Sequence, residues 1–301
     1  MKSDTRQVAS DRRSDPAFGP ESRHPSPVTR HAFTLIEMLT VISVLGILAA
    51  LTVPALKNLG KSNSAISASR QMLDAAGHAR QLAIANRTTV YMVFVPTNFW
   101  VVGGLFPNNW WTRLNADPKM GTAALNLCDR QLSGYTFVAY GAAGDQPGRH
   151  AWHYLEPWQA LPDGTFIAQW KFGPRNSTNT VANQATGASY SVRGFDTAQI
   201  PFPTETFPPG ISPPSLLLPY FPYIAFNYLG QLTSGQDEYI PLAQGSVLPA
   251  RDANKALQVG LPSVSSPSVL ETPPGNSLKA FNLVHIDWLT GRAVLEYQKV
   301  Q

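Results

Sequence analysis

The stretch RHAFTLIEMLTV, Arg30–Val41, places a single carboxylate, Glu37, close to the start of a long apolar run. The run continues as MLTVISVLGILAALTVPA, Met38–Ala55, in which no residue is charged. At a rise of about 1.5 Å per residue, this run approaches the thickness of about 30 Å of a bilayer's hydrocarbon core, and residues 33–36 complete a spanning length. A charge at the bilayer centre costs about 2.5–3.5 kcal/mol, so Glu37 requires a partner in such a setting.

Three interpretations compete for this segment. A secretory signal peptide has an apolar region of about 7–15 residues and a small-residue cleavage site. The run is longer than that, although residues 53–55 offer such a site and would leave a mature chain that begins at Leu56. An uncleaved signal anchor accounts for the length but not for the position of Glu37. The third interpretation rests on a resemblance.

Residues 30–39, RHAFTLIEML, resemble the leader junction of type IV prepilins and type II secretion pseudopilins. The resemblance implies that a membrane-bound prepilin peptidase cuts between Ala32 and Phe33 and methylates the new amino terminus of Phe33. It also implies that Glu37, the fifth residue of the mature chain, acts in assembly and that Pro54 bends the helix. The junction departs from the family pattern at Ala32, where glycine is usual, and in its long leader, which a start at Val28 would shorten.

The resemblance supplies the partner that Glu37 requires. The amino group of Phe33 has an ordinary pKa of about 7.7–8.0, so it is largely cationic at neutral pH, and methylation keeps the charge. In an assembled filament, Glu37 is expected to pair with the Phe33 amine of a neighbouring subunit, because a carboxylate exposed to lipid is costly. The alternative is that Glu37 is a charge at headgroup level that extends towards water.

The composition describes a folded, loop-rich chain. Among 301 residues, 44% are hydrophobic and 14% are charged, and 26 Pro and 22 Gly indicate many turns. The net charge of +4 is scattered, without a Lys/Arg block, so we expect no nucleic-acid partner. One cysteine, Cys128, allows no intrachain disulfide. The sequence has no G-x-S-x-G, P-loop or zinc pattern, so we expect no enzyme activity, no cofactor and no metal.

The chain is expected to form four segments: a cytoplasmic leader over 1–32, a transmembrane half-helix over 33–55, an amphipathic half-helix over 56–86 and a β-rich periplasmic domain over 87–301. The amphipathic half carries an apolar stripe at spacings of three and four residues. Its members are Ala65, Ala68, Met72, Ala76, Ala79 and Ala83. A long helix followed by an antiparallel sheet predicts an α+β, pilin-like fold.

Short β-rich runs separated by Gly, Pro and Asn predict the strands of the domain. The predicted strands are Thr88–Pro96, Phe99–Gly103, Gly134–Gly141, Gly164–Phe172 and Tyr223–Leu229. A final hairpin pairs Ala280–Trp288 with Ala293–Lys299, and Gly291 supplies the positive φ that its turn needs.

Four stretches of this region resemble landmarks of the minor pseudopilin H and FimT group more loosely than RHAFTLIEML resembles the leader junction. They are AGHARQLAIANRTTVYMVF (76–94), LPDGTFI (161–167), FNYLGQL (226–232) and VHIDWLTGRAVL (284–295). Two Pro-rich inserts, 201–222 and 263–276, are not part of that resemblance. They are expected to run as polyproline II or irregular loops that either cover a sheet edge or dock a partner.

Chemistry-bearing clusters are sparse. His150, His153 and Glu156 have a spacing that suits metal ligands on a helix, but Gly148 and Pro157 flank them, so a chance cluster is preferred. His285 and Asp287 alternate onto one strand face and are expected to be a surface pair. Cys128 is expected to be a small buried hydrophobe. The Trp residues are expected to pack in the core and at sheet edges rather than to form a binding platform. They are Trp100, Trp110, Trp111, Trp152, Trp158, Trp170 and Trp288.

The sequence therefore predicts a minor pilin-like subunit of a type II secretion or type IV pilus-related filament. Its expected partners are a prepilin peptidase, other pilin or pseudopilin subunits and the bacterial inner membrane, which it crosses once. A membrane-anchored adhesin or carbohydrate-binding module of the cell envelope is the alternative, and an anchored envelope enzyme comes third.

Overall fold

The structure is a computed structural model that divides into two compact units, Met1–Val53 and Pro54–Gln301. For residues 51–63 and 118–121 only the backbone is described. The described residues are 34–97, 118–141, 151–182, 187–202, 220–251, 253–254, 266–278 and 283–296.

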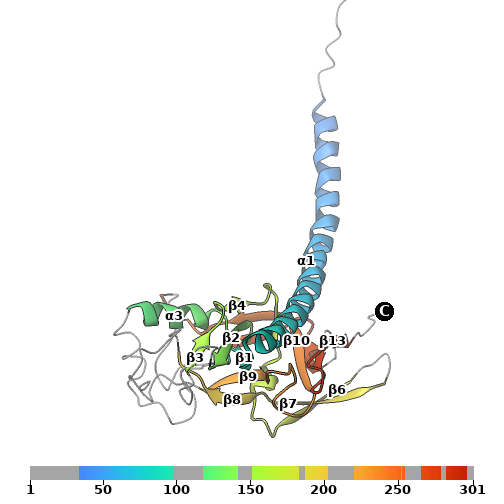
Figure 1. Cartoon of the computed structure of the whole chain (residues 1–301). Helices are drawn as coiled ribbons and strands as arrows, with labels where there is room; N and C mark the ends of the chain where they lie inside the picture. The colour runs from blue at the N-terminus through green and yellow to red at the C-terminus, as the bar shows by residue number, and fades with distance from the viewer. Residues whose placement is uncertain are drawn as a thin grey trace, which may run out of the picture. The chain divides into compact units, whose positions relative to one another are not determined.

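The helix α1, Leu35–Asn86, begins in the first unit and ends in the second. It ends at the predicted residue, and the predicted stripe from Ala65 to Ala83 is buried, with every member at most 3% exposed. Small side chains let the helix approach the sheet closely, and the members of the stripe from Ala68 to Ala83 share the main core with residues of β1, β2 and β9. Figure 1 shows the C-terminal part of α1 beside these strands. Among the helices of the described residues, none is long and apolar enough to cross a membrane.

The second unit is built on antiparallel sheets, which confirms an α+β fold with a β-sheet domain. One sheet has the strand order β3-β2-β1-β9-β8, with β4 also paired to β2. Its strands are β1 Thr89–Phe94, β2 Gly134–Tyr140, β3 Trp152–Tyr154, β4 Gln159–Ala160, β8 Asp196–Gln199 and β9 Tyr220–Phe226. We call it the first sheet.

The second sheet has the order β11-β10-β12-β13, with β5 also paired to β10, and β6 and β7 form a separate hairpin. Their bounds are β5 Thr165–Ile167, β6 Thr178–Ala182, β7 Ser189–Arg193, β10 Glu238–Leu248, β11 Ser268–Glu271, β12 Leu283–Ile286 and β13 Ala293–Glu296. Short helices complete the described elements: α3 Pro118–Cys128, η2 Gln169–Phe172 and η4 Asn276–Leu278.

The first sheet is covered on both faces. Along β1, Val90, Met92 and Phe94 pack in the main core with α1, whereas Val93 points to the opposite face. On that opposite face it meets residues of α3, among them Leu127. A sheet buried on both faces explains why TVYMVF reads as a nearly continuous apolar run rather than as an alternating one.

Most predicted strands are present: β1, β2 and β5 are shorter than predicted, β12 and β13 form the predicted hairpin, and β9 begins at Tyr220 and ends at Phe226, three residues earlier at each end than predicted. Phe99–Gly103 lies outside the described residues. The prediction of one strand over Gly164–Phe172 was wrong beyond Ile167, because the chain turns into η2 there. The strand β10 was missed, since Pro241 and Gly245 argue against a long strand. In the structure Pro241 still accepts a hydrogen bond from the amide of Ala168 (2.9 Å).

The predicted irregular inserts are partly replaced by strands. Pro222 belongs to β9, where it pairs with Thr197 of β8. Ser268–Glu271 forms β11 on the edge of β10, so the prediction of irregular structure was wrong for these four residues. Residues 203–219 and 255–265 lie outside the described part of the chain.

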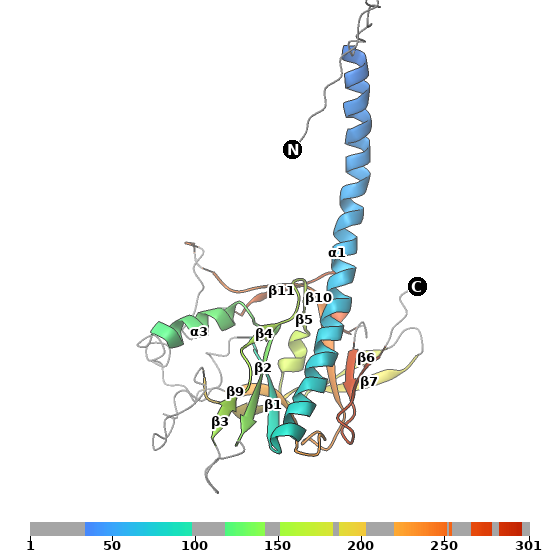
Figure 2. The same cartoon turned by 45° about the horizontal axis from the view of Figure 1, so that its top comes forward.

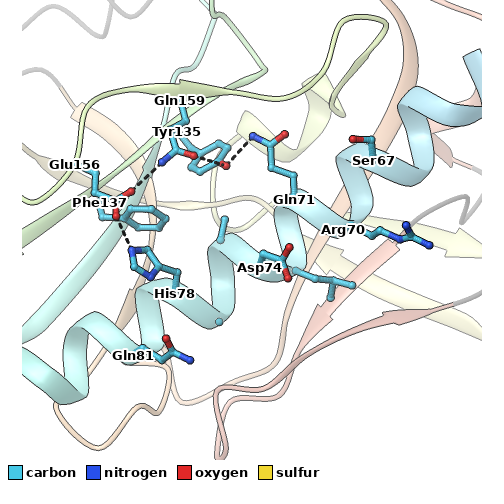
Figure 3. A pocket seen from close by; sticks show the side chains of 13 residues that line it. Ser67, Arg70, Gln71, Asp74, His78, Gln81, Tyr135, Phe137, Glu156 and Gln159 are labelled. Atoms are coloured by element: carbon cyan, nitrogen blue, oxygen red, sulfur yellow. Dashed lines mark hydrogen bonds and ion pairs between the residues drawn. The ribbon is translucent and has the colours of Figure 1, made fainter. Parts of the chain in front are cut away.

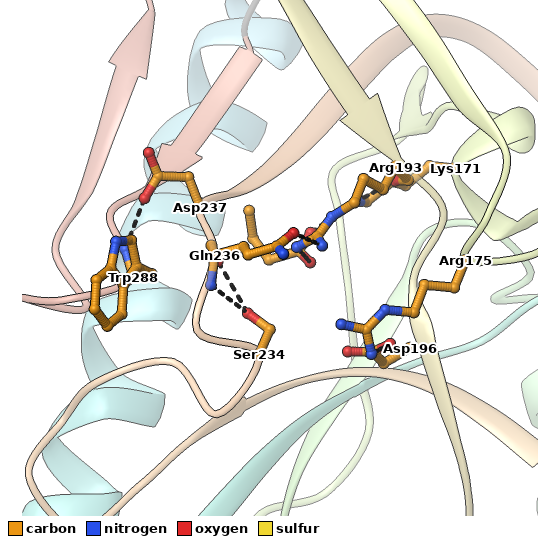
Figure 4. Close-up of polar contacts among 9 residues, drawn as sticks. Lys171, Arg175, Arg193, Asp196, Ser234, Gln236, Asp237 and Trp288 are labelled. Atoms are coloured by element: carbon orange, nitrogen blue, oxygen red, sulfur yellow. Dashed lines mark hydrogen bonds and ion pairs between the residues drawn. The ribbon is translucent and has the colours of Figure 1, made fainter.

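The turn into η2 carries Lys171 into the interior. Its side chain is fully buried, and its ammonium donates hydrogen bonds to the backbone oxygen of Arg193 (2.7 Å) and to Oε2 of Glu238 (2.8 Å). The ammonium also lies 4.6 Å from the ring centre of Phe195. Burial lowers the pKa of Lys171, and the Glu238 carboxylate opposes that shift. Figure 4 shows Lys171 beside Arg193, with the more exposed Arg175–Asp196 pair nearby.

The predicted turn glycine of the β12–β13 hairpin has φ +61°, which confirms its role. A Cβ at Gly291 would lie 1.9 Å from the carbonyl oxygen of Gly230, so the turn depends on glycine for space as well as for φ. We expect Gly291→Ala to destabilise the chain by about 3 kcal/mol in urea unfolding.

The matched control is Gly275→Ala, because Gly275 has φ +71° and no atom within 4 Å of an added Cβ. It should cost only the backbone strain of about 1 kcal/mol. Equal losses for the two variants would show that the contact with Gly230 is unimportant.

Candidate functional site

The first turn of α1 is organised by Thr34 and Glu37. The hydroxyl of Thr34 accepts a hydrogen bond from the amide of Glu37 (3.3 Å), and its carbonyl oxygen accepts from the amides of Glu37 (3.1 Å) and Met38 (3.2 Å). The residues Thr34–Glu37, TLIE, thus have the sequence pattern of a capping box, and the described residues form one of its two bonds, in which the Thr34 hydroxyl caps the amide three positions later. A carboxylate in the first turn also interacts favourably with the helix dipole.

The other polar side chains of this segment are satisfied within the helix. The hydroxyl of Thr40 donates to the carbonyl oxygen of Glu37, and that of Ser43 donates to the carbonyl oxygen of Leu39, both at 2.8 Å. Such hydroxyls cost little in apolar surroundings because their donors are paired. The carboxylate of Glu37, in contrast, has no hydrogen-bond or ion-pair partner among the described residues.

The apolar side chains of the same segment are exposed around the helix. They are Leu35 (86%), Ile36 (67%), Met38, Leu39, Val41, Ile42, Val44, Leu45, Ile47 and Leu48. A helix with exposed apolar side chains on every face normally contacts a membrane or another protein along that surface. The segment thus combines an apolar surface with one carboxylate for which the described part of the chain offers no partner.

Of the other predicted site residues in the N-terminal segment, the structure describes only one. Ala32 and Phe33 lie outside the described residues, so cleavage and methylation there stay predictions. Pro54 lies within α1 and is the first residue of the second unit. The bend assigned to it also stays a prediction.

The contact of Glu156 with His78 was missed from the sequence. Nε2 of His78 on α1 lies 2.5 Å from Oε1 of Glu156, whose Oε2 accepts a hydrogen bond from Gln159 (2.8 Å). Tyr135 donates to Gln159 (3.0 Å) and accepts from Gln71 of α1 (2.9 Å). His78 and Glu156 are 78 residues apart in the chain, so no local sequence pattern predicts that they pair.

This network lines an open groove of about 780 Å³ between α1 and the β2–β4 region (Figure 3). Both carboxylate oxygens of Glu156 and the hydroxyl of Tyr135 are engaged inside the network, and burial raises the pKa of Tyr135. The arrangement fastens the helix to the sheet. His150 lies outside the described residues, His153 lies on β3, and no group of three metal-ligating side chains occurs among the described residues.

The structure gives His285 and Asp287 different partners. Nε2 of His285 lies 3.2 Å from Oδ2 of Asp237, and Nδ1 lies 3.3 Å from Oε1 of Glu296. Asp287 follows the end of β12 and accepts hydrogen bonds from the amide and hydroxyl of Thr290, which lower its pKa. The prediction that the two share one strand face was wrong because β12 ends at Ile286, between them. His285 still acts electrostatically on the Asp287 carboxylate, as a further cause of its lowered pKa.

Cys128 is fully buried in the core, as predicted, and burial raises the pKa of its thiol to about 12. The described Trp residues at 152, 158 and 170 are partly buried against core clusters, which confirms the packing role for them. Trp288 is 41% exposed. Trp100, Trp110 and Trp111 lie outside the described residues.

Comparison with known proteins bears on the N-terminal segment. Residues 29–53 match the family model described as the prokaryotic N-terminal methylation motif. No curated protein and no solved structure matches the chain. The matched residues include the predicted junction, the capping box and Glu37. The motif implies processing by a prepilin peptidase and assembly with pilin subunits, and it supports a type IV pilin-like protein anchored in a membrane.

Proposed function

We propose that this chain is a minor pseudopilin of a type II secretion or type IV pilus-related filament, similar to the pseudopilin H and FimT group. The observation that carries the proposal is the methylation motif over residues 29–53, together with a Glu37 carboxylate that has no partner among the described residues. The α+β architecture of helix α1 and an antiparallel sheet domain supports it further.

In the proposed mechanism the chain acts by assembly. A prepilin peptidase removes residues 1–32 and methylates the Phe33 amine, while residues 33–55 hold the subunit in the inner membrane. The helix then docks laterally against a neighbouring subunit, whose Phe33 amine receives the Glu37 carboxylate. The pairing removes the cost of a lone carboxylate in apolar surroundings. The domain over 87–301 is displayed in the periplasm.

The proposal predicts a defined mature terminus. Coexpression of the full chain with a prepilin peptidase should yield a chain that begins with N-methyl-Phe33, as measured by mass spectrometry of the N-terminal peptide. Ala32→Leu should block the cut, because the junction requires a small residue before it. Ala32→Gly, which restores the usual residue, is the matched control and should be processed at least as completely. A mature chain that begins at Leu56 would establish the signal-peptide interpretation instead.

A further inference from the structure

Two turns of the β domain meet beside the last turns of α1 (Figure 2). The turn over residues 227–231 follows β9, and the turn over 287–291 joins β12 to β13. The amide of Leu232 donates to the carbonyl oxygen of Trp288 (2.9 Å), and Nε of Arg80 on α1 donates to the carbonyl oxygen of Thr290 (2.8 Å). A Cβ at Gly230 would lie 2.9 Å from Cδ1 of Ile84, so the first turn also touches the helix.

Side-chain oxygens fix the backbone of both turns. Oδ1 of Asn227 accepts hydrogen bonds from the amides of Leu229 (2.9 Å) and Gln231 (3.0 Å). Oδ1 of Asp287 accepts from the amide of Thr290 (2.7 Å), and Oδ1 of Asp237 accepts from the amide of Trp288 (2.9 Å). The turns are therefore held in one conformation before any partner binds, which reduces the entropy lost on binding.

Four large apolar side chains extend from these fixed turns into solvent. Their exposed fractions are 59% for Tyr228, 58% for Leu229, 41% for Trp288 and 53% for Leu289. We call these four residues the apolar tip. Scattered single apolar residues are normal on a surface, but a group on adjoining turns marks a contact site. Trp and Tyr on a rigid backbone are also the residue types that dominate binding energy at protein interfaces.

The charges around the apolar tip indicate the chemistry of its partner. Arg87 lies between α1 and β1, and the pairing of Val90 in β1 with Phe226 in β9 brings this end of β1 beside the turn over 227–231. Arg292 directly follows the hairpin turn, and both arginines are exposed. Neither has a side-chain partner among the described residues.

Two acids lie at these turns: Asp287 in the hairpin turn and Asp237 just before β10, both engaged in the hydrogen bonds described above. Both carboxylates stay ionised, but their charge is directed at the turn groups that donate to them. The side-chain charges at the rim that have no partner among the described residues are therefore the two arginines, which complement carboxylates on a partner.

We propose that the apolar tip docks a protein subunit whose contact segment carries apolar side chains flanked by Asp or Glu. A lipid surface fits less well, because recognition of anionic lipid uses clusters of about 4–8 Lys/Arg, whereas this rim offers two free arginines and contains carboxylates. The inference rests on the proposed function only for the place where the partner is sought, the membrane fraction of the cells that produce the protein. Docking at the tip does not require cleavage after Ala32.

The test is photo-crosslinking from position 229. A benzophenone amino acid replaces Leu229 in the full chain, and the crosslinked peptide is identified by mass spectrometry. We expect one partner protein, joined through a peptide that contains apolar residues next to Asp or Glu. The combined change Arg87→Gln and Arg292→Gln should lower the yield about fivefold, as expected for the loss of two exposed ion pairs.

The matched control places the same amino acid at Leu270, which is 61% exposed on β11. It should not give the same adduct. An equal adduct from Leu270, an adduct with lipid or with a second copy of this chain, or a yield unchanged by the arginine substitutions would overturn the proposal. Cleavage before Phe33 is measured on the same samples. Loss of cleavage would contradict the proposed function, whereas loss of the specific adduct with normal cleavage would contradict docking at the apolar tip alone.

Discussion

Lys171→Met is expected to destabilise the β domain by about 3 kcal/mol. Methionine fills a similar volume, so the loss reflects the ion pair rather than a cavity. The substitution removes the donor of two hydrogen bonds, to Arg193 and Glu238, and the cation above the Phe195 ring. Glu238 is nearly as buried as Lys171, and a buried carboxylate that loses a partner is costly. Arg193 lies 3.3 Å from Oε1 of Glu238, which keeps the loss below that of an isolated buried charge.

The measurement is thermal unfolding of the full chain in detergent, followed by Trp fluorescence, with an expected fall in Tm of roughly 10 °C. The control is Arg175→Gln at the neighbouring Arg175–Asp196 pair. The Arg175 side chain is 48% exposed, so its loss should cost less than about 1 kcal/mol. If the two variants unfold at the same temperature, the buried pair contributes no more than a surface pair.

The sequence predicted the elements whose signal is local. The stripe from Ala65 to Ala83 and the end of α1 at Asn86 follow from helical periodicity, and the final hairpin follows from Gly291. The strand β10 was missed because Pro241 and Gly245 are counted against a strand wherever they occur. In the structure Leu242, next to Pro241, pairs with β5 and Pro241 itself pairs with β12. These partners are 75 and 42 residues away, respectively, and no local pattern contains them.

The candidate site shows the same difference between features with a local sequence signal and features that depend on the fold. RHAFTLIEML is contiguous, so it pointed to the junction and to Glu37 without knowledge of the fold, and the family model matches the same residues. The capping pattern of Thr34 and Glu37 is also contiguous, so TLIE alone predicts it, whereas the resemblance to prepilins implies a role for the Glu37 carboxylate only. His78–Glu156 and Lys171–Glu238 join distant segments, and only the fold brings them together.

Glu37→Gln is expected to prevent or weaken assembly while leaving earlier steps intact. Glutamine keeps the shape of the side chain and also suits the third position of a capping box, so the first turn of α1 should persist. Insertion should be at least as favourable because a charge is removed. Cleavage after Ala32 should survive. In the filament, the Phe33 amine of the neighbour then faces no carboxylate. Breaking a fully buried ion pair destabilises a contact by about 3–5 kcal/mol, and we expect the subunit contact to lose part of that amount.

Crosslinking of the assembly helix tests this claim most directly. A photo-reactive amino acid at Leu39, which is 51% exposed, reports contact with partner subunits in membranes. The wild-type chain and Glu37→Asp, which keeps the charge, provide the comparison. Our account predicts that adducts with partner subunits form in both and are lost in Glu37→Gln, although all three chains begin at N-methyl-Phe33. Equal adducts in Glu37→Gln and wild type would show that Glu37 is a headgroup-level charge and would contradict the assembly role.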